Sequence, residues 1–373
     1  MAGEFVTARR NRLLSFFYRR LFKPIFFRLD PERVHDRLTA AGVFLGRRAP
    51  ARELARLLFD YRHPSLTQTI KGITFPNPVG LSAGFDKNAW LTGIIPAVGF
   101  GFMEVGSITG RPCEGNPKPR LWRLKKSEAL VVYYGLKNEG AAAIEKRLRG
   151  KKFVFPVGVS IAKANCPETA ETAAGIQDYF EAYRTLAAVG DYVTVNISCP
   201  NAFGGQPFTD RARLAALLAR LNTIPKTKPI FVKLSPDLEP ATVETIVEVS
   251  LAAQVDGFVC TNLTKKRDNP KILDAQVPEQ GGLSGKIVAD LSDQMIKRVY
   301  RLTGGRAVII GTGGVFTAAD AYRKIRAGAS LIQLITGMIF RGPQTASEIN
   351  LGLVKLLTRD GFKNIGEAVG RDN

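Results

Sequence analysis

Histidines, paired cysteines and long apolar runs are scarce in this chain of 373 residues. Its only histidines, His35 and His63, lie near the N-terminus, so proton transfer further along the chain needs another type of side chain. None of the four cysteines belongs to a CxxC pair, which gives little support to a zinc or iron–sulfur site and fits a reduced, cytosol-facing protein. No run of about 18 apolar residues occurs, so a membrane-spanning helix is not expected.

The chain carries a large excess of positive charge. Its 53 lysines and arginines outnumber its 33 aspartates and glutamates, which gives a formal net charge of +20. Such an excess attracts an anionic partner, which can be nucleic acid, an acidic membrane surface or a phosphorylated ligand. The charge alone does not choose among them. The hydrophobic fraction of 45% suffices for one large core with a small appendage.

Residues 9–28 predict a cationic amphipathic helix. A helix with bulky apolar residues on one face and basic residues on the other is typical of a membrane interface. Arg19 and Arg20 interrupt the apolar region too early for a signal peptide, whereas a mitochondrial presequence and a helix packed on the next domain stay open. The apolar stripe comprises Leu13, Leu14, Phe17, Tyr18, Leu21 and Phe22, and the basic face comprises Arg12, Arg19, Arg20 and Lys23.

Two further short helices are expected before the main domain. Pro24 should end or kink the first helix, because proline lacks a backbone N–H. The next helix starts after Asp30, a good N-cap, with Pro31 in its first turn, and a third covers Glu53–Phe59. Residues 1–62 are therefore predicted to form an amphipathic helical module that lies on a membrane and frames an apolar pocket, ahead of a larger domain over residues 63–373.

From about residue 73 onward, short β-rich runs alternate with helical stretches. Eight such units predict an α/β fold, a (β/α)8 TIM barrel with a small N-terminal α-helical extension. A doubly wound open sheet is the alternative. The expected strands are Val79–Ala83, Phe102–Ser107, Val157–Ala162, Tyr192–Ser198, Ile230–Ser235, Gly257–Asn262, Val308–Gly313 and Leu331–Thr336. The expected helices include Asp178–Val189, Arg211–Leu221, Pro240–Ala253, Ala289–Leu302, Ala318–Ala327 and Ala346–Leu357.

Small or polar residues stand at the ends of all eight expected strands. Active sites of such barrels lie at the C-terminal ends of the strands, and the loops after strands seven and eight often bind phosphate. The glycine-rich segments 310–314 and 336–337 fall at these two ends, and segment 281–285 adds a third. Glycines let backbone N–H groups approach an anion, so these segments predict a site for a phosphate group.

Lys233 and Cys199 are the candidate catalytic residues. Lys233 ends a buried-looking strand and suits the N1/O2 edge of a flavin ring, unless it forms an ion pair on the barrel rim. Cys199 lies in a polar loop between Asn196 and Asn201, and a thiol with a reference pKa of about 8.5 can exchange a proton near neutral pH. Together with Asn262, the two asparagines suit a ligand with amide or imide groups, such as a pyrimidine ring.

Over nearly all of its length the chain resembles the dihydroorotate dehydrogenases. The segment LDPERVHDRL (29–38) looks like the membrane-associated, quinone-using class of that family. The resemblance implies FMN as cofactor, oxidation of dihydroorotate to orotate in pyrimidine biosynthesis, and ubiquinone or menaquinone as electron acceptor. The matching segments are NPVGLSAGFDKN (77–88), GSITGRP (106–112), GNPKPRLWRL (115–124), VNISCPN (195–201), VKLSPDL (232–238), CTN (260–262), GGLSG (281–285), IIGTGG (309–314) and GMIFRGP (337–343).

The resemblance also implies roles for individual residues. Cys199 would remove the C5 proton while a hydride passes from C6 to flavin N5, and Lys233 would face the flavin. FMN contacts are implied for Ala83, Gly84, Lys87, Ser107, Ser160, Asn196, Lys233, Thr261, Gly285, Gly313, Gly314, Thr336 and Gly337. Substrate contacts are implied for Lys87, Gly135, Leu136, Asn138, Asn196, Asn201 and Asn262.

The chain departs from the family pattern at three positions. The quinone-using class usually has a serine base, whereas Cys199 is the choice of the soluble class. Val132 stands where a substrate-binding asparagine is usual, and Leu263 where a threonine or serine is usual. Each lost hydrogen-bonding partner costs about 1–3 kcal/mol unless another group, such as Lys137 or Tyr134, substitutes.

These departures leave alternatives for the function. The chain could be an FMN oxidoreductase that acts on another dihydropyrimidine or uses a soluble acceptor. An RNA-directed flavoenzyme like the dihydrouridine synthases suits the charge of +20, but neither the N-terminal aromatic helix nor segment 29–38. We therefore expect no nucleic-acid partner, and place the protein as a peripheral membrane protein on the anionic cytoplasmic face of the inner (cell) membrane.

Overall fold

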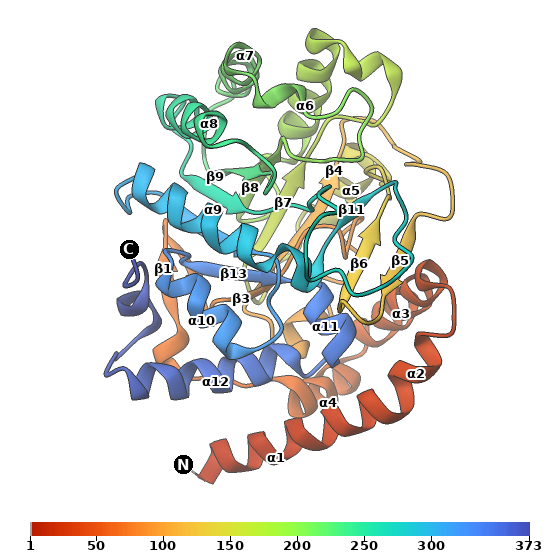
Figure 1. Cartoon of the computed structure of the whole chain (residues 1–373), viewed down its shortest axis with the longest axis vertical. Helices are drawn as coiled ribbons and strands as arrows, with labels where there is room; N and C mark the ends of the chain where they lie inside the picture. The colour runs from red at the N-terminus through yellow and green to blue at the C-terminus, as the bar shows by residue number, and fades with distance from the viewer. Residues whose placement is uncertain (1) are drawn as a thin grey trace.

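Eight parallel strands closed into a barrel form the centre of the computed structural model, which describes residues 2–373 (Figure 1). The ring closes because the first barrel strand pairs with the last, with Leu81 opposite Leu334. This closure confirms the predicted TIM barrel and excludes the doubly wound open sheet. The barrel strands are β3 (Val79–Leu81), β4 (Phe102–Ile108), β7 (Val157–Ile161), β8 (Tyr192–Asn196), β9 (Ile230–Leu234), β10 (Gly257–Cys260), β12 (Val308–Thr312) and β13 (Leu331–Leu334).

The helices that surround the barrel largely follow the predicted pattern. α6 is the main difference: it begins at Thr172 rather than Asp178, because the Glu171 side chain caps it by accepting from the backbone N–H groups of Ala173 and Ala174. Asp178 instead accepts hydrogen bonds from Ala164 and Gly110. The helices are α5 (Ala141–Leu148), α6 (Thr172–Leu186), α7 (Arg211–Leu221), α8 (Pro240–Ala252), α9 (Ala289–Leu302), α10 (Ala318–Arg326), α11 (Thr336–Arg341) and α12 (Thr345–Arg359).

The N-terminal end of the barrel is closed by aromatic side chains. A hairpin of β1 (Gln68–Ile70) and β2 (Ile73–Phe75) brings Phe75 edge-to-face against Phe102, with ring centroids 5.3 Å apart. Tyr192 and Phe231, each first or second in its strand, pack in the same buried cluster. This end therefore has no room for a ligand, and a site is left to the C-terminal ends of the strands.

A small antiparallel sheet, which the sequence did not predict, lies beside the C-terminal ends of the strands. It consists of β5 (Leu121–Leu124), β6 (Ala129–Val132) and β11 (Gly282–Leu283). Val132, the last residue of β6, pairs with both Leu121 and Gly282. The sheet therefore fixes the start of the loop at residues 132–138, which carries several of the implied substrate contacts.

Four α-helices and one π turn precede the barrel and lie together along one side of it (Figure 1). Asp30 caps α3 as predicted, with its side chain accepting from the backbone N–H of Arg33. Pro24 does not end the helical backbone: a π turn ends at Phe22, and Pro24 is the second residue of the α2 turn that follows it. The segments are α1 (Ala2–Phe17), the π turn (Tyr18–Phe22), α2 (Lys23–Phe26), α3 (Pro31–Gly46) and α4 (Ala49–Phe59).

Four of the six residues of the predicted apolar stripe are exposed, and one, Tyr18, turns inward. Tyr18 turns toward the barrel, where its hydroxyl donates to the carbonyl of Ile339 at 2.6 Å. The contact of α1 with α12 is polar, because Asn11 donates to the Ser347 hydroxyl at 3.0 Å. Large apolar side chains stay exposed instead, namely Phe5, Val6, Leu13, Phe16, Phe17, Leu21, Phe22 and Ile25. No helix within residues 2–373 has the length and apolar content needed to cross a membrane.

Candidate active site

A cavity of about 210 Å³ lies at the C-terminal ends of the barrel strands. The strands end one or two residues earlier than predicted at most positions, so the polar residues that follow leave the hydrogen-bonded ladder and turn inward. The cavity brings together Ala83, Gly84, Lys87, Ser107, Gly135, Leu136, Asn196, Cys199, Asn201, Lys233, Thr261, Asn262, Gly285, Gly313, Gly314, Thr336 and Gly337.

Two residues predicted for the site do not line this cavity. Ser160 is fully buried behind it, with its hydroxyl 2.8 Å from that of Ser107. Asn138 is 5% exposed, and its amide nitrogen donates to the Thr109 hydroxyl and to the Leu136 carbonyl, both at 2.8 Å. Asn138 therefore holds the shape of the 132–138 loop, and the geometry gives it no direct contact with a ligand in the cavity.

At one end of the cavity the backbone is left uncovered by Gly314 and Gly337, where a side chain would collide with neighbouring atoms. We call this region the glycine surface. Gly314 has φ +71°, and an added Cβ would lie 2.3 Å from the Cβ of Ala289. At Gly337 an added Cβ would lie 2.1 Å from the Val315 carbonyl oxygen. The Ser284 and Thr336 hydroxyls face each other at 2.8 Å on the same side. Exposed backbone N–H groups and hydroxyls of this kind suit a phosphate group.

Lys233 projects from β9 into the cavity while only 5% of it is exposed. Burial lowers the pKa of its ammonium group, and the negative charges of Glu104 and Cys199 oppose this effect. Within residues 2–373 no carboxylate oxygen lies within 4.0 Å of its ammonium nitrogen, although Glu104 acts on it from further away. A desolvated cation without a partner is suited to an anionic or electron-rich ring edge.

Three asparagines surround the loop that carries Cys199. Asn196 donates to the Ser107 hydroxyl at 2.8 Å, and its oxygen accepts from Asn262 at 3.3 Å. Asn201 donates to the Val132 carbonyl at 2.7 Å, while its buried side-chain oxygen has no partner within residues 2–373. That free acceptor fits a ligand N–H, as the sequence suggested for a ring with amide groups.

Cys199 follows β8 and is partly buried. Burial raises the pKa of its thiol, whereas the Asn201 backbone N–H and the positive charges of Lys163 and Lys233 oppose this rise. The thiol is therefore desolvated and lies within range of the positive charges of two lysines. Such a group can exchange a proton with a bound ligand.

The positions that depart from the family pattern present apolar side chains to the cavity. Val132 and Leu263 both line it, and only their backbone groups take part in hydrogen bonds, to Asn201 and Asn262. Tyr134 does not supply the missing group, because its ring lies under Lys87 and its buried hydroxyl has no partner in the described chain. Lys137 lines the same cavity, 3.9 Å from Glu32.

Lys163, which follows β7, was not among the residues predicted from the sequence. It is 3% exposed, and its ammonium group donates to the Phe203 carbonyl at 2.7 Å, in the loop that begins at Cys199. Asn165 holds the same loop through the backbone N–H of Phe203 at 2.5 Å. The rule that found Lys233, a polar residue at the end of a buried strand, applies equally to Lys163.

The residues of the cavity fit a flavin mononucleotide. At Gly84 an added Cβ would meet only Ile335, at 3.8 Å, so the absence of a side chain leaves open space in the cavity. The glycine surface at Gly314 and Gly337 offers a phosphate site, and Lys233 offers a cation for the ring edge. The donors needed for both ends of the cofactor are therefore present in one continuous cavity.

The fold and the cavity define an enzyme of the (β/α)8-barrel class, with its ligands at the C-terminal ends of the strands. Residues 65–357 match the sequence model of the dihydroorotate dehydrogenases. The chain belongs to this family.

Curated relatives match over almost the whole chain. A protein of Roseiflexus sp. (strain RS-1), named dihydroorotate dehydrogenase (quinone), is 43% identical over 356 residues, which cover 94% of this chain and 97% of the relative. A protein of Deinococcus deserti with the same name is 41% identical and covers 95% of this chain and 99% of the relative. Because these matches leave only 5–6% of the chain uncovered, most of residues 1–62 lies within the matched region.

Solved structures agree with this assignment. The dihydroorotate dehydrogenase of Eimeria tenella in complex with ferulenol has a TM-score of 0.81 and 32% identity, over 92% of this chain and 96% of that one. Its ligand-free form has a TM-score of 0.83. The fold of this chain is therefore shared with these structures over 92% of its length.

Proposed function

We propose that this protein oxidises dihydroorotate to orotate with FMN as cofactor and a quinone as electron acceptor. The observation that carries the proposal is one cavity in which Cys199, an unpaired Lys233 and the free acceptor of Asn201 converge, in a chain of the dihydroorotate dehydrogenase family. The names of the curated relatives, each called dihydroorotate dehydrogenase (quinone), support the substrate and the acceptor.

FMN would lie along the glycine surface, with Gly313, Gly314 and Thr336 around the phosphate and Lys233 at the ring edge. When bound, the flavin supplies the hydride acceptor for C6 of the substrate and passes the electrons on to quinone. Ser107 and Asn196 are hydrogen-bonded to each other, which fixes both side chains on the wall between cofactor and substrate.

Cys199 is proposed as the base that takes the proton from C5 of dihydroorotate. Loss of this proton and of a hydride from C6 leaves the C5–C6 double bond of orotate, so atoms and charges balance. The reacting form is the thiolate, and the nearby ammonium groups of Lys163 and Lys233 stabilise that form against the cost of burial. Lys163 also restrains the loop that begins at Cys199 through its hydrogen bond to the Phe203 carbonyl.

The substrate ring would be held by Asn196, Asn201 and Asn262, with Lys87 for the carboxylate. Lys87 lines the cavity, and its 3.9 Å approach to the Tyr134 ring keeps its ammonium group in place. Val132 and Leu263 would make only apolar contacts with the ring. Because this lining is apolar, turnover of other dihydropyrimidines should be measured beside that of dihydroorotate.

Residues 1–62 are proposed as a module that lies on an anionic membrane and admits the quinone. Fourteen of the twenty exposed large apolar side chains fall between Phe5 and Leu57, although these helices are a small part of the chain. Such an apolar patch marks an interaction surface, and basic residues such as Arg12, Arg19 and Arg20 suit anionic lipids. A peripheral position on the cytoplasmic face of the cell membrane follows from this proposal.

The apolar part of the cavity points toward the same helices. Leu121, Leu130, Phe316 and Ile339 line it, and Phe27 from the N-terminal segment packs against this group. A quinone that enters from the membrane would therefore reach the flavin along an apolar path, on the side away from Cys199.

Steady-state turnover of the FMN-loaded protein tests the proposal. Orotate formation should depend on dihydroorotate and on a short-chain quinone, and should be much slower with fumarate or NAD as acceptor. Faster turnover with a soluble acceptor would contradict the quinone assignment, and preferred turnover of dihydrouracil or dihydrothymine would contradict the substrate.

A further inference from the structure

A buried ion pair joins the N-terminal helices to the rim of the active site. Glu32, near the start of α3, is 4% exposed, and Arg120, just before β5, is 5% exposed. The Arg120 Nη2 lies 2.8 Å from Glu32 Oε1, and its Nε lies 3.1 and 3.2 Å from the two carboxylate oxygens. Because both charges are removed from water, removal of one partner leaves the other uncompensated, which costs far more than loss of a surface pair.

Arg120 connects this ion pair to the two loops of the substrate pocket. Its Nη1 donates to the carbonyls of Glu114 and Asn116 at 3.0 and 2.9 Å. The Asn116 side chain in turn donates to the Asn201 carbonyl at 3.2 Å. The carboxylate of Glu32 therefore fixes a guanidinium that supports the loop following Cys199.

Arg120 and Lys87 lie against the same aromatic ring. The Arg120 guanidinium carbon is 5.3 Å from the centroid of Tyr134, and the Lys87 ammonium nitrogen is 3.9 Å from it. Desolvated contacts of this kind stabilise a cation over the face of the ring. Glu32, Arg120, Tyr134 and Lys87 thus form a continuous stack from helix α3 to the cavity, with the carboxylate as its only anion.

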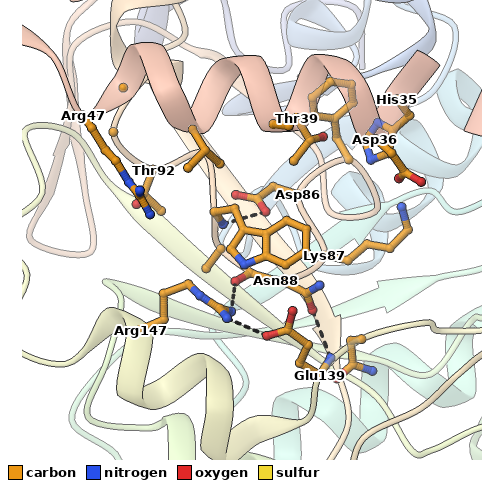
Figure 2. A pocket seen from close by; sticks show the side chains of 18 of the residues that line it. His35, Asp36, Thr39, Arg47, Asp86, Lys87, Asn88, Thr92, Glu139 and Arg147 are labelled. Carbon is orange, nitrogen blue, oxygen red and sulfur yellow. Dashed lines mark hydrogen bonds and ion pairs between the residues drawn. The ribbon is translucent and has the colours of Figure 1, made fainter. Parts of the chain in front are cut away.

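Helix α3 also faces Lys87 directly, across a second cavity of about 1550 Å³. Figure 2 shows Lys87 extending toward His35 and Asp36 of this helix. Burial lowers the pKa of Lys87 to about 8, and the charge of Lys137 lowers it as well, whereas Asp36, Glu32 and Asp86 raise it. His35 is neutral near pH 7, because burial lowers its pKa to about 3. Two of the three anions that keep Lys87 charged therefore belong to α3.

We propose that helix α3 supports the dihydroorotate-binding side of the active site. Glu32 is a positioning residue that orients Lys87 and the 132–138 loop for an anionic substrate. This proposal rests on the proposed function, because it takes dihydroorotate as the ligand of Lys87. A module assigned to the membrane and the quinone would then also tune the substrate site on the opposite side of the flavin.

Glu32→Gln in the full-length, FMN-loaded protein is the first test. The variant keeps the shape of the side chain and removes its charge, so orotate should bind about tenfold more weakly in calorimetry. The alkaline limb of the rate of anaerobic flavin reduction by dihydroorotate should move to lower pH, because Lys87 loses a charge that raises its pKa. Reoxidation by a short-chain quinone should keep its rate. Glu53→Gln is the matched control. Glu53 lies on α4, lines the same second cavity as Glu32 and forms an ion pair with the exposed Arg56.

Lys137→Gln tests the same idea with the opposite sign and leaves the buried Arg120–Glu32 pair intact, because the Lys137 side chain is 44% exposed and lies 3.9 Å from Glu32. Loss of its repulsion should move the alkaline limb to higher pH. Unchanged orotate affinity and pH profiles in both variants would overturn the proposal, as would equal losses in flavin reduction and reoxidation. If Glu32→Gln does not fold, the Lys137→Gln profile decides alone. A wild type that does not reduce its flavin with dihydroorotate would overturn the proposed function and this inference together.

Discussion

At the scale of single residues, the proton chemistry depends on Cys199 and the charges around it. Burial raises the pKa of its thiol, so the thiolate that acts as base becomes more abundant as the pH rises through that raised value. The rate of flavin reduction by dihydroorotate should therefore increase with pH on the acid limb of its profile, as the thiolate fraction grows, and fall on the alkaline limb, where Lys87 loses its charge.

Substitution of Cys199 tests this assignment. Cys199→Ser should slow flavin reduction and move its rise to higher pH, because a hydroxyl holds its proton more tightly than a thiol. Cys199→Ala should remove nearly all of it, a loss of about 100-fold or more. Rapid-mixing absorbance of the flavin under anaerobic conditions measures both variants. An alanine variant with the wild-type rate would rule out the proton role of Cys199.

Lys163 is the second residue whose role can be measured. Lys163→Met removes a charge that lowers the pKa of Cys199 and the hydrogen bond to the Phe203 carbonyl. The pH dependence of flavin reduction should shift to higher pH, with a rate about tenfold lower near neutral pH.

The control for Lys163 is Lys226→Met, because Lys226 also donates to a backbone carbonyl, that of Gln254 at 2.6 Å, but lies outside the cavity. A shift of the pH profile in the control as large as in Lys163→Met would mean that the effect is not local to Cys199.

At the scale of elements, the loop after β12 should decide whether FMN binds. Gly314→Ala places a Cβ 2.3 Å from that of Ala289 at a φ of +71°, so it should cost about 1–3 kcal/mol of overpacking in addition to the backbone strain. The purified variant should lose its bound flavin, and its dissociation constant in a fluorescence titration with FMN should rise by at least about tenfold.

Gly150→Ala separates crowding from strain. Gly150 also has φ +71°, but an added Cβ there meets nothing within 4 Å. Its substitution should lower the free energy of unfolding by about 1 kcal/mol and leave FMN binding unchanged. Equal FMN affinities for the two alanine variants would mean that the glycine surface does not hold the cofactor.

The elements of the barrel were predictable from the sequence because each strand is a short apolar run that ends in a polar or small residue. Lys233 and Cys199 were found by that rule, and Lys163 would have been. The sheet of β5, β6 and β11 was not predicted, since β11 pairs with β6 across 150 residues and the short runs of β5 and β6 show no strong alternation. Asn138 was assigned to the substrate from the family motif, but its partners are Thr109 and Leu136, which only the folded loop brings near.

Other features depend on tertiary contacts that no local pattern reveals. Asp178 looks like a helix start, yet it lies within α6 because its carboxylate meets the backbone of Ala164 and Gly110. Glu32 and Arg120 are each unremarkable in the sequence, and their buried ion pair follows only from the docking of α3 on the barrel.

At the scale of the whole molecule, the uneven distribution of exposed apolar side chains should control where the protein resides. A triple variant Leu13→Ser, Phe17→Ser and Leu21→Ser removes three exposed side chains from the N-terminal helices. It should sediment with anionic vesicles at least about fivefold less than the wild type, since burial of apolar area drives interfacial binding. Its turnover with a short-chain quinone should stay within about twofold in detergent-free buffer.

The control for membrane binding changes exposed apolar residues of the barrel. Val154→Ser and Leu273→Ser alter side chains that are 77% and 61% exposed but lie outside residues 1–62. Vesicle binding should be unaffected. If both sets of substitutions reduce sedimentation equally, binding is not directed by the N-terminal helices.

The proposed function depends on one reaction, the reduction of bound FMN by dihydroorotate. The direct measurement is an anaerobic titration of the yellow, FMN-loaded protein with dihydroorotate, dihydrouracil or dihydrothymine, followed by flavin absorbance. We predict stoichiometric bleaching by dihydroorotate, with formation of an equal amount of orotate, and little bleaching by the two analogues that lack the carboxylate for Lys87. A protein that binds no FMN, or a flavin that dihydroorotate leaves oxidised, would contradict the account.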